Sequence, residues 1–178
     1  MWWPVLSIDP GACDLMDQIL NFRGVADNRG PSLITTSGQP SEADLAALSS
    51  NGVAAIINLA LHSHERALPD EAASCAALGM EYIHIPVAFD APTEADYIQF
   101  CAAMTALSGK RVHVHCILNA RVTAFFHRYG PSAALMTAAQ ADALLDSVWR
   151  PGGVWAAFIG SDARRSADHE YCGRDYHL

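Results

Sequence analysis

The chain has 178 residues, of which 51% are hydrophobic, and a net charge of −8. This length suffices for one domain with one hydrophobic core. The negative charge argues against nucleic acid and against an anionic membrane surface as partners, because both require a basic face. An anionic substrate must therefore be bound by local groups.

The start of the chain, MWWPVLSIDP, contains no basic residue, and its apolar run is interrupted by Asp9 and Pro10 before it reaches the length of a signal peptide or a membrane span. The cysteines are isolated and odd in number, which argues against a disulfide framework and against a structural zinc site. They are Cys13, Cys75, Cys101, Cys116 and Cys172. We expect a cytoplasmic protein with an N-terminal extension (1–20), one α/β domain (21–160) and a polar tail (161–178).

The first half of the chain alternates between strand-like and helix-like segments. Residues 32–48, SLITTSGQPSEADLAAL, indicate a strand, a turn and a helix. Ser41 is suited to cap this helix, and Asp44 completes the capping box. The run VAAIINLAL at 53–61 indicates a strand that is buried on both faces.

The alternation continues to the end of the expected domain. We expect a helix that closes at Gly79, a strand at 81–89, a helix at 94–107, a strand at 111–116, a long helix from about Val122 to Tyr129 ended by Gly130-Pro131, and helices within 133–149 and 154–159. Such regular alternation predicts an α/β fold with a central, mostly parallel sheet flanked by helices.

The segment HCILNAR, residues 115–121, lies where the strand at 111–116 passes into a helix. In α/β sheets, functional crevices form at the carboxyl ends of the strands. The amides of Ile117, Leu118, Asn119 and Ala120, together with Arg121, are expected to form an anion-binding cup. The same groups would stabilise a thiolate of Cys116, and Asn119 can adopt the left-handed conformation that a tight loop requires.

Three segments resemble a known family: VHVHCILNARVTAF, TSGQPSEADLAALSSNGVAAIINLA and EYIHIPVAFDAPTEAD. They are similar to the bacterial branch of the cysteine-dependent protein tyrosine and dual-specificity phosphatase-like proteins, over roughly residues 20 to 160. The resemblance implies the phosphatase-like α/β fold, a nucleophilic thiolate at Cys116 and a phosphate-binding Arg121. It also implies a general acid before the preceding helix, a role that falls on Asp90 in FDAPT, and it implies no cofactor.

The sequence departs from the signature of that family at the loop itself. The signature is His-Cys-x5-Arg with a central glycine and a Ser or Thr after the Arg, whereas this chain has His-Cys-x4-Arg, Asn119 in place of the glycine, and Val122 after Arg121. The loop is one residue shorter, and it offers correspondingly fewer amides to a phosphate. Thr123 is a candidate for the missing hydroxyl, although a Thr at this position commonly bonds back to the helix.

Three functions follow from these patterns. The leading one is hydrolysis of a phosphate monoester, carried by a small phosphorylated molecule or by a phosphoprotein. A six-residue loop is also similar in size to that of rhodanese-type sulfurtransferases, which makes sulfur transfer the first alternative. The second alternative is a module that binds an anion or a phosphoprotein without catalysis. The oligomeric state is left open.

The histidines around the loop admit two interpretations. His113 and His115 lie on one face of their strand and could bind a metal together with His62 and His64. We favour structural imidazoles and expect no metal. His115 is expected to support the loop by a hydrogen bond, and Thr123 is kept as a second supporting residue.

Overall fold

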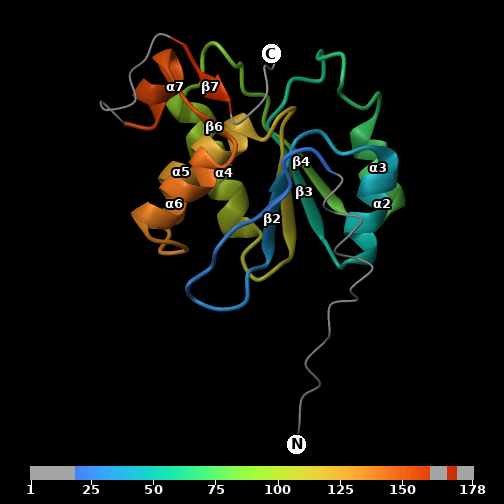
Figure 1. Ribbon diagram of the computed structural model, residues 1–178. Coiled ribbons are helices and arrows are strands. Elements are labelled where there is room, and N and C mark those ends of the chain that lie inside the picture. The colour runs from blue at the N-terminus through green and yellow to red at the C-terminus, as the bar shows by residue number, and fades with distance from the viewer. Residues whose placement is uncertain (1–18, 161–167, 172–178) are drawn as a thin grey trace, which may run out of the picture.

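A five-stranded sheet forms the centre of the protein in a computed structural model that describes residues 19–160 and 168–171 (Figure 1). The strands lie in the order β1-β2-β5-β3-β4. Only β1 is antiparallel to its neighbour, so the prediction of a mostly parallel sheet is confirmed. The strands are β1 (Arg23–Gly24), β2 (Ile34–Ser37), β3 (Ala55–Asn58), β4 (Glu81–His84) and β5 (Val112–His115).

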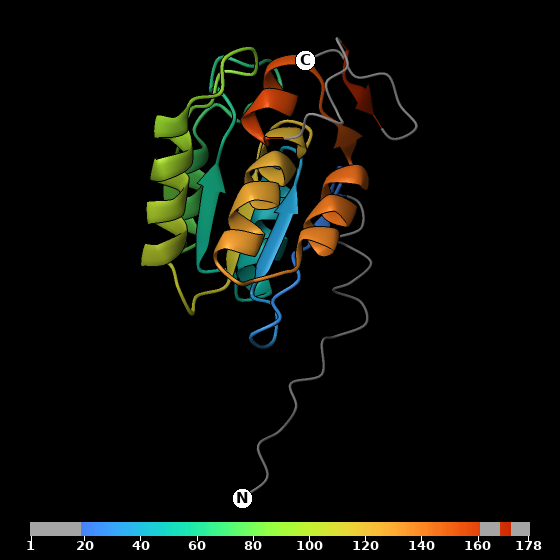
Figure 2. The ribbon, with the colours of Figure 1, turned by 90° about the vertical axis from the view of Figure 1, so that its left-hand side faces the viewer.

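Helices cover both faces of this sheet. Helices α2 (Glu42–Ser50) and α3 (Glu71–Ala77) cover one face, whereas α4 (Glu94–Ala106), α5 (Ala120–Ser132) and α6 (Ala138–Asp146) lie across the other (Figures 1 and 2). The chain then forms β6 (Trp149–Arg150) and α7 (Gly153–Phe158), and β7 (Glu170–Tyr171) pairs antiparallel with β6.

The helices begin where local side chains can satisfy their first amides. Ser41 and Asp44 form the expected capping box of α2, and Thr93 and Asp96 form a second box at the start of α4. Each box satisfies two backbone donors that have no partner inside the helix.

Two hydrophobic cores hold the layers together. The larger one lies between the sheet and the helices α4, α5 and α6, and it includes Phe100, Phe125 and the fully buried Trp149. The smaller one lies between the sheet and α2 and α3, around Leu45 and Leu48. All four residues of both β3 and β5 are buried, as expected for parallel strands covered on both faces.

Three details differ from the sequence-based expectations. Helix α5 does not end at Gly130-Pro131 but continues to Ser132, because Pro131 lies in its last turn and Ala133 still donates to the carbonyl of Tyr129 at 2.8 Å. Residues 133–136 form no helix, since α6 begins only after its N-cap, Thr137. Part of the expected polar tail forms β7, while residues 161–167 and 172–178 of the tail and nearly all of the N-terminal extension lie outside the described residues.

Within the part of the chain that the structure describes, no helix is both long enough and apolar enough to cross a bilayer.

Candidate functional site

Cys116 directly follows the last residue of β5, at the carboxyl edge of the sheet. His115 pairs with Ser37 on one side and with Asn58 on the other, so the loop starts between the ends of β2 and β3. The Cys116 amide donates to the carbonyl of Ser37 at 3.3 Å, and the Cys116 side chain is fully buried. The structure therefore places this cysteine at the strand-to-helix junction that the sequence predicts.

The carbonyl groups of the loop are bonded to surrounding segments. The Ile117 carbonyl accepts from the amide of Gln39 at 3.1 Å, and the Leu118 carbonyl accepts from the Asn21 side chain at 2.9 Å. In a planar trans peptide the N–H points opposite to the C=O, and the described residues contain no cis peptide. The Leu118 amide, which follows the Ile117 carbonyl, consequently points away from Gln39. The Asn119 amide, which follows the Leu118 carbonyl, points away from the Asn21 side chain.

The first turn of α5 supplies amides that have no backbone partner among the described residues. Its N-cap, Asn119, has φ 69°, the expected left-handed conformation, and makes no side-chain cap. The Asn119 side chain instead donates to the Asn21 carbonyl at 2.8 Å and to the Thr36 hydroxyl at 2.9 Å. The amides of residues 120–122 donate to no backbone oxygen among the described residues, which leaves them available for an anion.

Arg121 lies beside these amides and is only 5% exposed. Its Nε donates to the Val87 carbonyl at 3.0 Å, and its guanidinium carbon lies 5.0 Å from the centroid of the Phe89 ring. No carboxylate of the described residues forms an ion pair with it. A buried arginine without a carboxylate partner is expected to bind an anion, because an uncompensated buried charge is costly.

Asp90 is located on the segment that contacts Arg121. It follows Phe89, is exposed, and precedes the Thr93 cap of α4. The contacts of Arg121 with Val87 and Phe89 therefore tie the Asp90 segment to the loop.

The hydroxyl of Thr123 makes two hydrogen bonds to other residues of the protein. The hydroxyl donates to the Ala120 carbonyl at 3.1 Å and accepts from the indole N–H of Trp149 at 3.2 Å. This is the bonding back to the helix that the sequence analysis gave as the common alternative. The Thr123 hydroxyl is thus engaged by Ala120 and Trp149.

His115 pairs with a residue that the sequence analysis did not identify. Its Nε2 lies 2.7 Å from Oε1 of Glu71 at the start of α3, and its Nδ1 lies 3.4 Å from the Cys116 carbonyl. Asn58 also donates to Glu71 at 2.9 Å. Burial raises the pKa of the Glu71 carboxyl, but the hydrogen bond and charge of His115, with contributions from Gln39 and Tyr82, outweigh it and lower the pKa below its ordinary value.

His62, His84 and His113 also contact other side chains. His113 lies 2.9 Å from the hydroxyls of both Thr35 and Ser37, while His62 stacks on His84 with 3.7 Å between ring centroids. Among the described residues, no three His, Cys, Asp or Glu side chains group as a metal site would require. The His62, His84 and His113 rings are thus in contact with neighbouring side chains.

Tyr171 of β7 is a second residue near the loop that the sequence analysis missed. Its ring stacks on Trp149 with 5.7 Å between centroids. Burial raises the pKa of Tyr171 to about 12, and Cys116 raises it and Arg121 lowers it to smaller extents. The phenol is therefore within electrostatic reach of both loop residues. No sequence periodicity marked this short strand.

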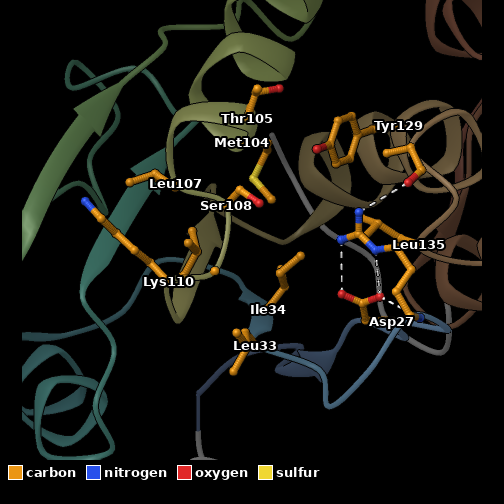
Figure 3. A pocket seen from close by; sticks show the side chains of 14 residues that line it. Asp27, Leu33, Ile34, Met104, Thr105, Leu107, Ser108, Lys110, Tyr129 and Leu135 are labelled. Carbon is orange, nitrogen blue, oxygen red and sulfur yellow. Dashed lines mark hydrogen bonds and ion pairs between the residues drawn. The ribbon is translucent and has the colours of Figure 1, made fainter.

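A pocket of about 280 Å³ lies at the other end of the sheet (Figure 3). It is lined by Ile34 and Val112, the first residues of β2 and β5, and by residues from the ends of α4 and α5. Cys116 instead follows the last residue of β5. The pocket is accordingly separate from the loop.

Together, the layered sheet and the strand-loop-helix site define a phosphatase-like α/β protein. A structure of Pseudomonas aeruginosa TpbA in complex with phosphotyrosine has the same fold, with a TM-score of 0.52 and 14% identity over 74% of this chain and 73% of that one. The kinase-associated phosphatase KAP gives a TM-score of 0.59 at 14% identity, over 72% of this chain and 83% of that one.

A more similar structure shows the family. A Shewanella putrefaciens CN-32 protein, described as "Putative phosphatase (DUF442)", is 30% identical with a TM-score of 0.69, over 83% of this chain and 93% of that one. The chain belongs to this DUF442 family of phosphatase-like proteins. No protein-family model matches the chain.

One curated relative matches a part of the chain. A "Beta-lactamase hydrolase-like protein" of Agrobacterium fabrum is 37% identical over 86 residues, which are 47% of this chain. The match spans 20% of that protein, so the chain corresponds to about a fifth of its length.

Proposed function

We propose that the chain is a cysteine-dependent phosphatase that hydrolyses a phosphate monoester in the cup formed by residues 116–121. The observation that carries the proposal is the buried guanidinium of Arg121 next to the amides at the start of α5, because among the described residues the guanidinium has no carboxylate partner and these amides have no backbone acceptor. This arrangement is suited to binding an oxyanion close to Cys116, which precedes the helix.

The reaction has two steps. The thiolate of Cys116 attacks phosphorus and forms an S–P bond, while the P–O bond breaks and the leaving oxygen takes a proton from Asp90. Water then attacks the phosphocysteine and gives its proton to the Asp90 carboxylate, and the S–P bond breaks to release phosphate and the thiolate. Arg121 and the loop amides stabilise the charge of the transferring group in both steps.

Hydrolysis of an aryl phosphate tests this proposal. We expect wild type to release phosphate, Cys116→Ser to release none while still binding phosphate, and Asp90→Asn to lose about 100- to 10,000-fold in kcat. Glu94→Gln is the matched control, because it removes an exposed acid of α4 that pairs with Arg128. Undiminished hydrolysis by Cys116→Ser would refute the proposal.

Sulfur transfer is the second candidate, and the engaged hydroxyl of Thr123 favours it. A six-residue loop in which the Thr123 hydroxyl is already engaged offers few donors to the several oxygens of a phosphate ester, whereas a cysteine persulfide needs fewer. The Cys116 thiolate would take the outer sulfur of thiosulfate, releasing sulfite and leaving a persulfide. Cyanide would then remove that sulfur as thiocyanate.

The two chemistries separate in one experiment. Wild type is incubated with aryl phosphate or with thiosulfate, and phosphate and thiocyanate are measured. Thiocyanate without phosphate would replace the phosphatase proposal by sulfur transfer. Oxyanion binding with neither product would leave a non-catalytic module, whose partner is then a phosphorylated or other anionic molecule.

A further inference from the structure

Glu71 is a buried carboxylate beside His115, the residue that directly precedes Cys116. It is 2% exposed, and the mechanism proposed above does not use it. Its partners include residues of three other elements, namely His115 at 2.7 Å, Asn58 at 2.9 Å and the Tyr82 hydroxyl at 3.4 Å. The side chain of Gln39 donates to it as well, at 3.5 Å. A carboxylate buried in this way keeps its charge only if a cation or several donors compensate it.

The two ring nitrogens of His115 both face oxygen acceptors. Nε2 faces the Glu71 carboxylate, and Nδ1 faces the carbonyl of Cys116 at 3.4 Å. A neutral imidazole has one N–H and one lone pair, so it would direct its lone pair at one of these acceptors. The imidazolium, with two N–H groups, offers a donor to both sides, and its contact with Glu71 is a close ion pair rather than an aligned hydrogen bond.

Among the described titratable groups around His115, only Glu71 is an anion that faces the imidazole ring. His113 lies on the same face of β5, and its ring stacks against that of His115 with 6.3 Å between centroids. Burial, and to a smaller extent the charge of His115, holds the pKa of His113 well below its ordinary value. From β4, burial raises the pKa of Tyr82 and lowers that of His84. Cys116 follows on the loop itself. Glu71 is accordingly the anion that faces the ring.

The Cys116 carbonyl belongs to the same peptide group as the amide of Ile117. A donor to the carbonyl polarises that peptide and strengthens the Ile117 N–H, one of the amides of the proposed cup, as a hydrogen-bond donor. We propose that Glu71 is a positioning residue that acts through His115, holding the ring as an imidazolium against this peptide and so stabilising negative charge at Cys116. The inference rests on the proposed function only in taking Cys116 as the reacting group.

The ionisation of Cys116 is the direct readout. The ultraviolet absorbance of the thiolate is followed against pH, and the Cys116→Ser curve is subtracted for each variant. We expect Glu71→Gln to move the midpoint upward by about one pH unit or more, the size of shift produced by a nearby charge. Glu71→Asp keeps the charge and should restore part of the shift.

Glu81→Gln is the matched control, because Glu81 is exposed on β4 and pairs only with the surface residue Lys110 among the described residues. It removes the same charge and should leave the midpoint in place. An unchanged midpoint in a folded Glu71→Gln variant, or an equal shift in Glu81→Gln, would overturn the inference.

A double variant tests whether Glu71 acts through His115. In a His115→Asn background, Glu71→Gln should add no further shift of the Cys116 midpoint. Additive shifts would show that Glu71 acts by another route, and the inference would then be wrong.

The wild-type protein provides a test that does not depend on variant folding. In ¹⁵N-histidine-labelled protein at neutral pH, NMR should show two protonated ring nitrogens for His115, whereas a singly protonated ring would overturn the inference. The outcome is independent of the proposed activity. If Glu71→Gln shifts the midpoint of Cys116 ionisation but wild type releases no phosphate, the role of Glu71 is supported and the phosphatase proposal is refuted. If wild type releases phosphate but Glu71→Gln causes no shift, the phosphatase proposal is supported and the role of Glu71 is refuted.

Discussion

The Nε of Arg121 donates to the carbonyl oxygen of Val87 across 3.0 Å, which fixes the guanidinium between α5 and the segment that carries Asp90. The same group lies over the Phe89 ring. One side chain therefore both faces the loop and anchors the segment of the proposed general acid. A lysine cannot reproduce this arrangement, because it lacks the planar fork of donors.

We expect Arg121→Lys to weaken oxyanion binding by about 10- to 100-fold, the equivalent of one charge-assisted hydrogen bond. The measurement is the concentration of phosphate or vanadate that protects Cys116 from alkylation. Arg128→Lys, further along α5, is the control, since Arg128 pairs with Glu94 and stacks on Tyr97. Equal protection in Arg121→Lys and wild type would contradict the role of the arginine.

Gly38 lies against the loop so closely that a side chain does not fit. A Cβ at this position would lie 2.7 Å from the carbonyl oxygen of Ile117 and 3.1 Å from that of Leu20. Because both are backbone atoms, we expect Gly38→Ala to displace the loop, to cost about 1–3 kcal/mol of unfolding free energy and to reduce phosphate release.

Gly30→Ala is the matched control, since a Cβ there meets nothing within 4 Å. Urea unfolding and the aryl phosphate assay are compared for both variants. If Gly38→Ala were as stable and active as Gly30→Ala, the loop would tolerate movement away from Gly38.

Thr123 is expected to stabilise the fold without taking part in the chemistry. Thr123→Val leaves the Trp149 N–H buried without its acceptor, which should cost about 1–3 kcal/mol of unfolding free energy. Thr123→Ser retains the hydroxyl and should lose less. A Thr123→Val variant with normal stability but strongly reduced kcat would instead assign the hydroxyl to catalysis.

His113 should make stability depend on pH in a defined direction. Burial holds its pKa in the folded state well below the ordinary value of 6.5, so only the unfolded chain binds a proton there as the pH falls through 6.5. The contribution of the neutral His113 to the free energy of unfolding is therefore complete above pH 6.5. Below that pH it declines by about 1.4 kcal/mol per pH unit.

Urea unfolding between neutral and mildly acidic pH measures this slope. A His113→Gln variant removes the titrating group, and its slope should correspond to one proton fewer than that of wild type. Equal slopes in the two proteins would show that His113 binds a proton in the folded state as well.

Much of the architecture could be predicted because its signals are local. The capping box of Ser41 and Asp44, the left-handed Asn119 and the buried runs of β3 and β5 depend on residues a few positions apart. The position of Cys116 between a strand and a helix follows from the same local patterns.

The α/β layers, the loop and its functional candidates Cys116 and Arg121 can be derived from the amino-acid sequence alone. Which distant groups surround them depends on how the helices pack against the sheet. Glu71 reads as an ordinary helix-start acid until α3 packs against the end of β5 and buries it beside His115. The hydrogen bond between Trp149 and Thr123 is likewise absent from any sequence pattern. Partners that lie far apart in the chain produce no periodic signal, because packing of the folded chain selects them.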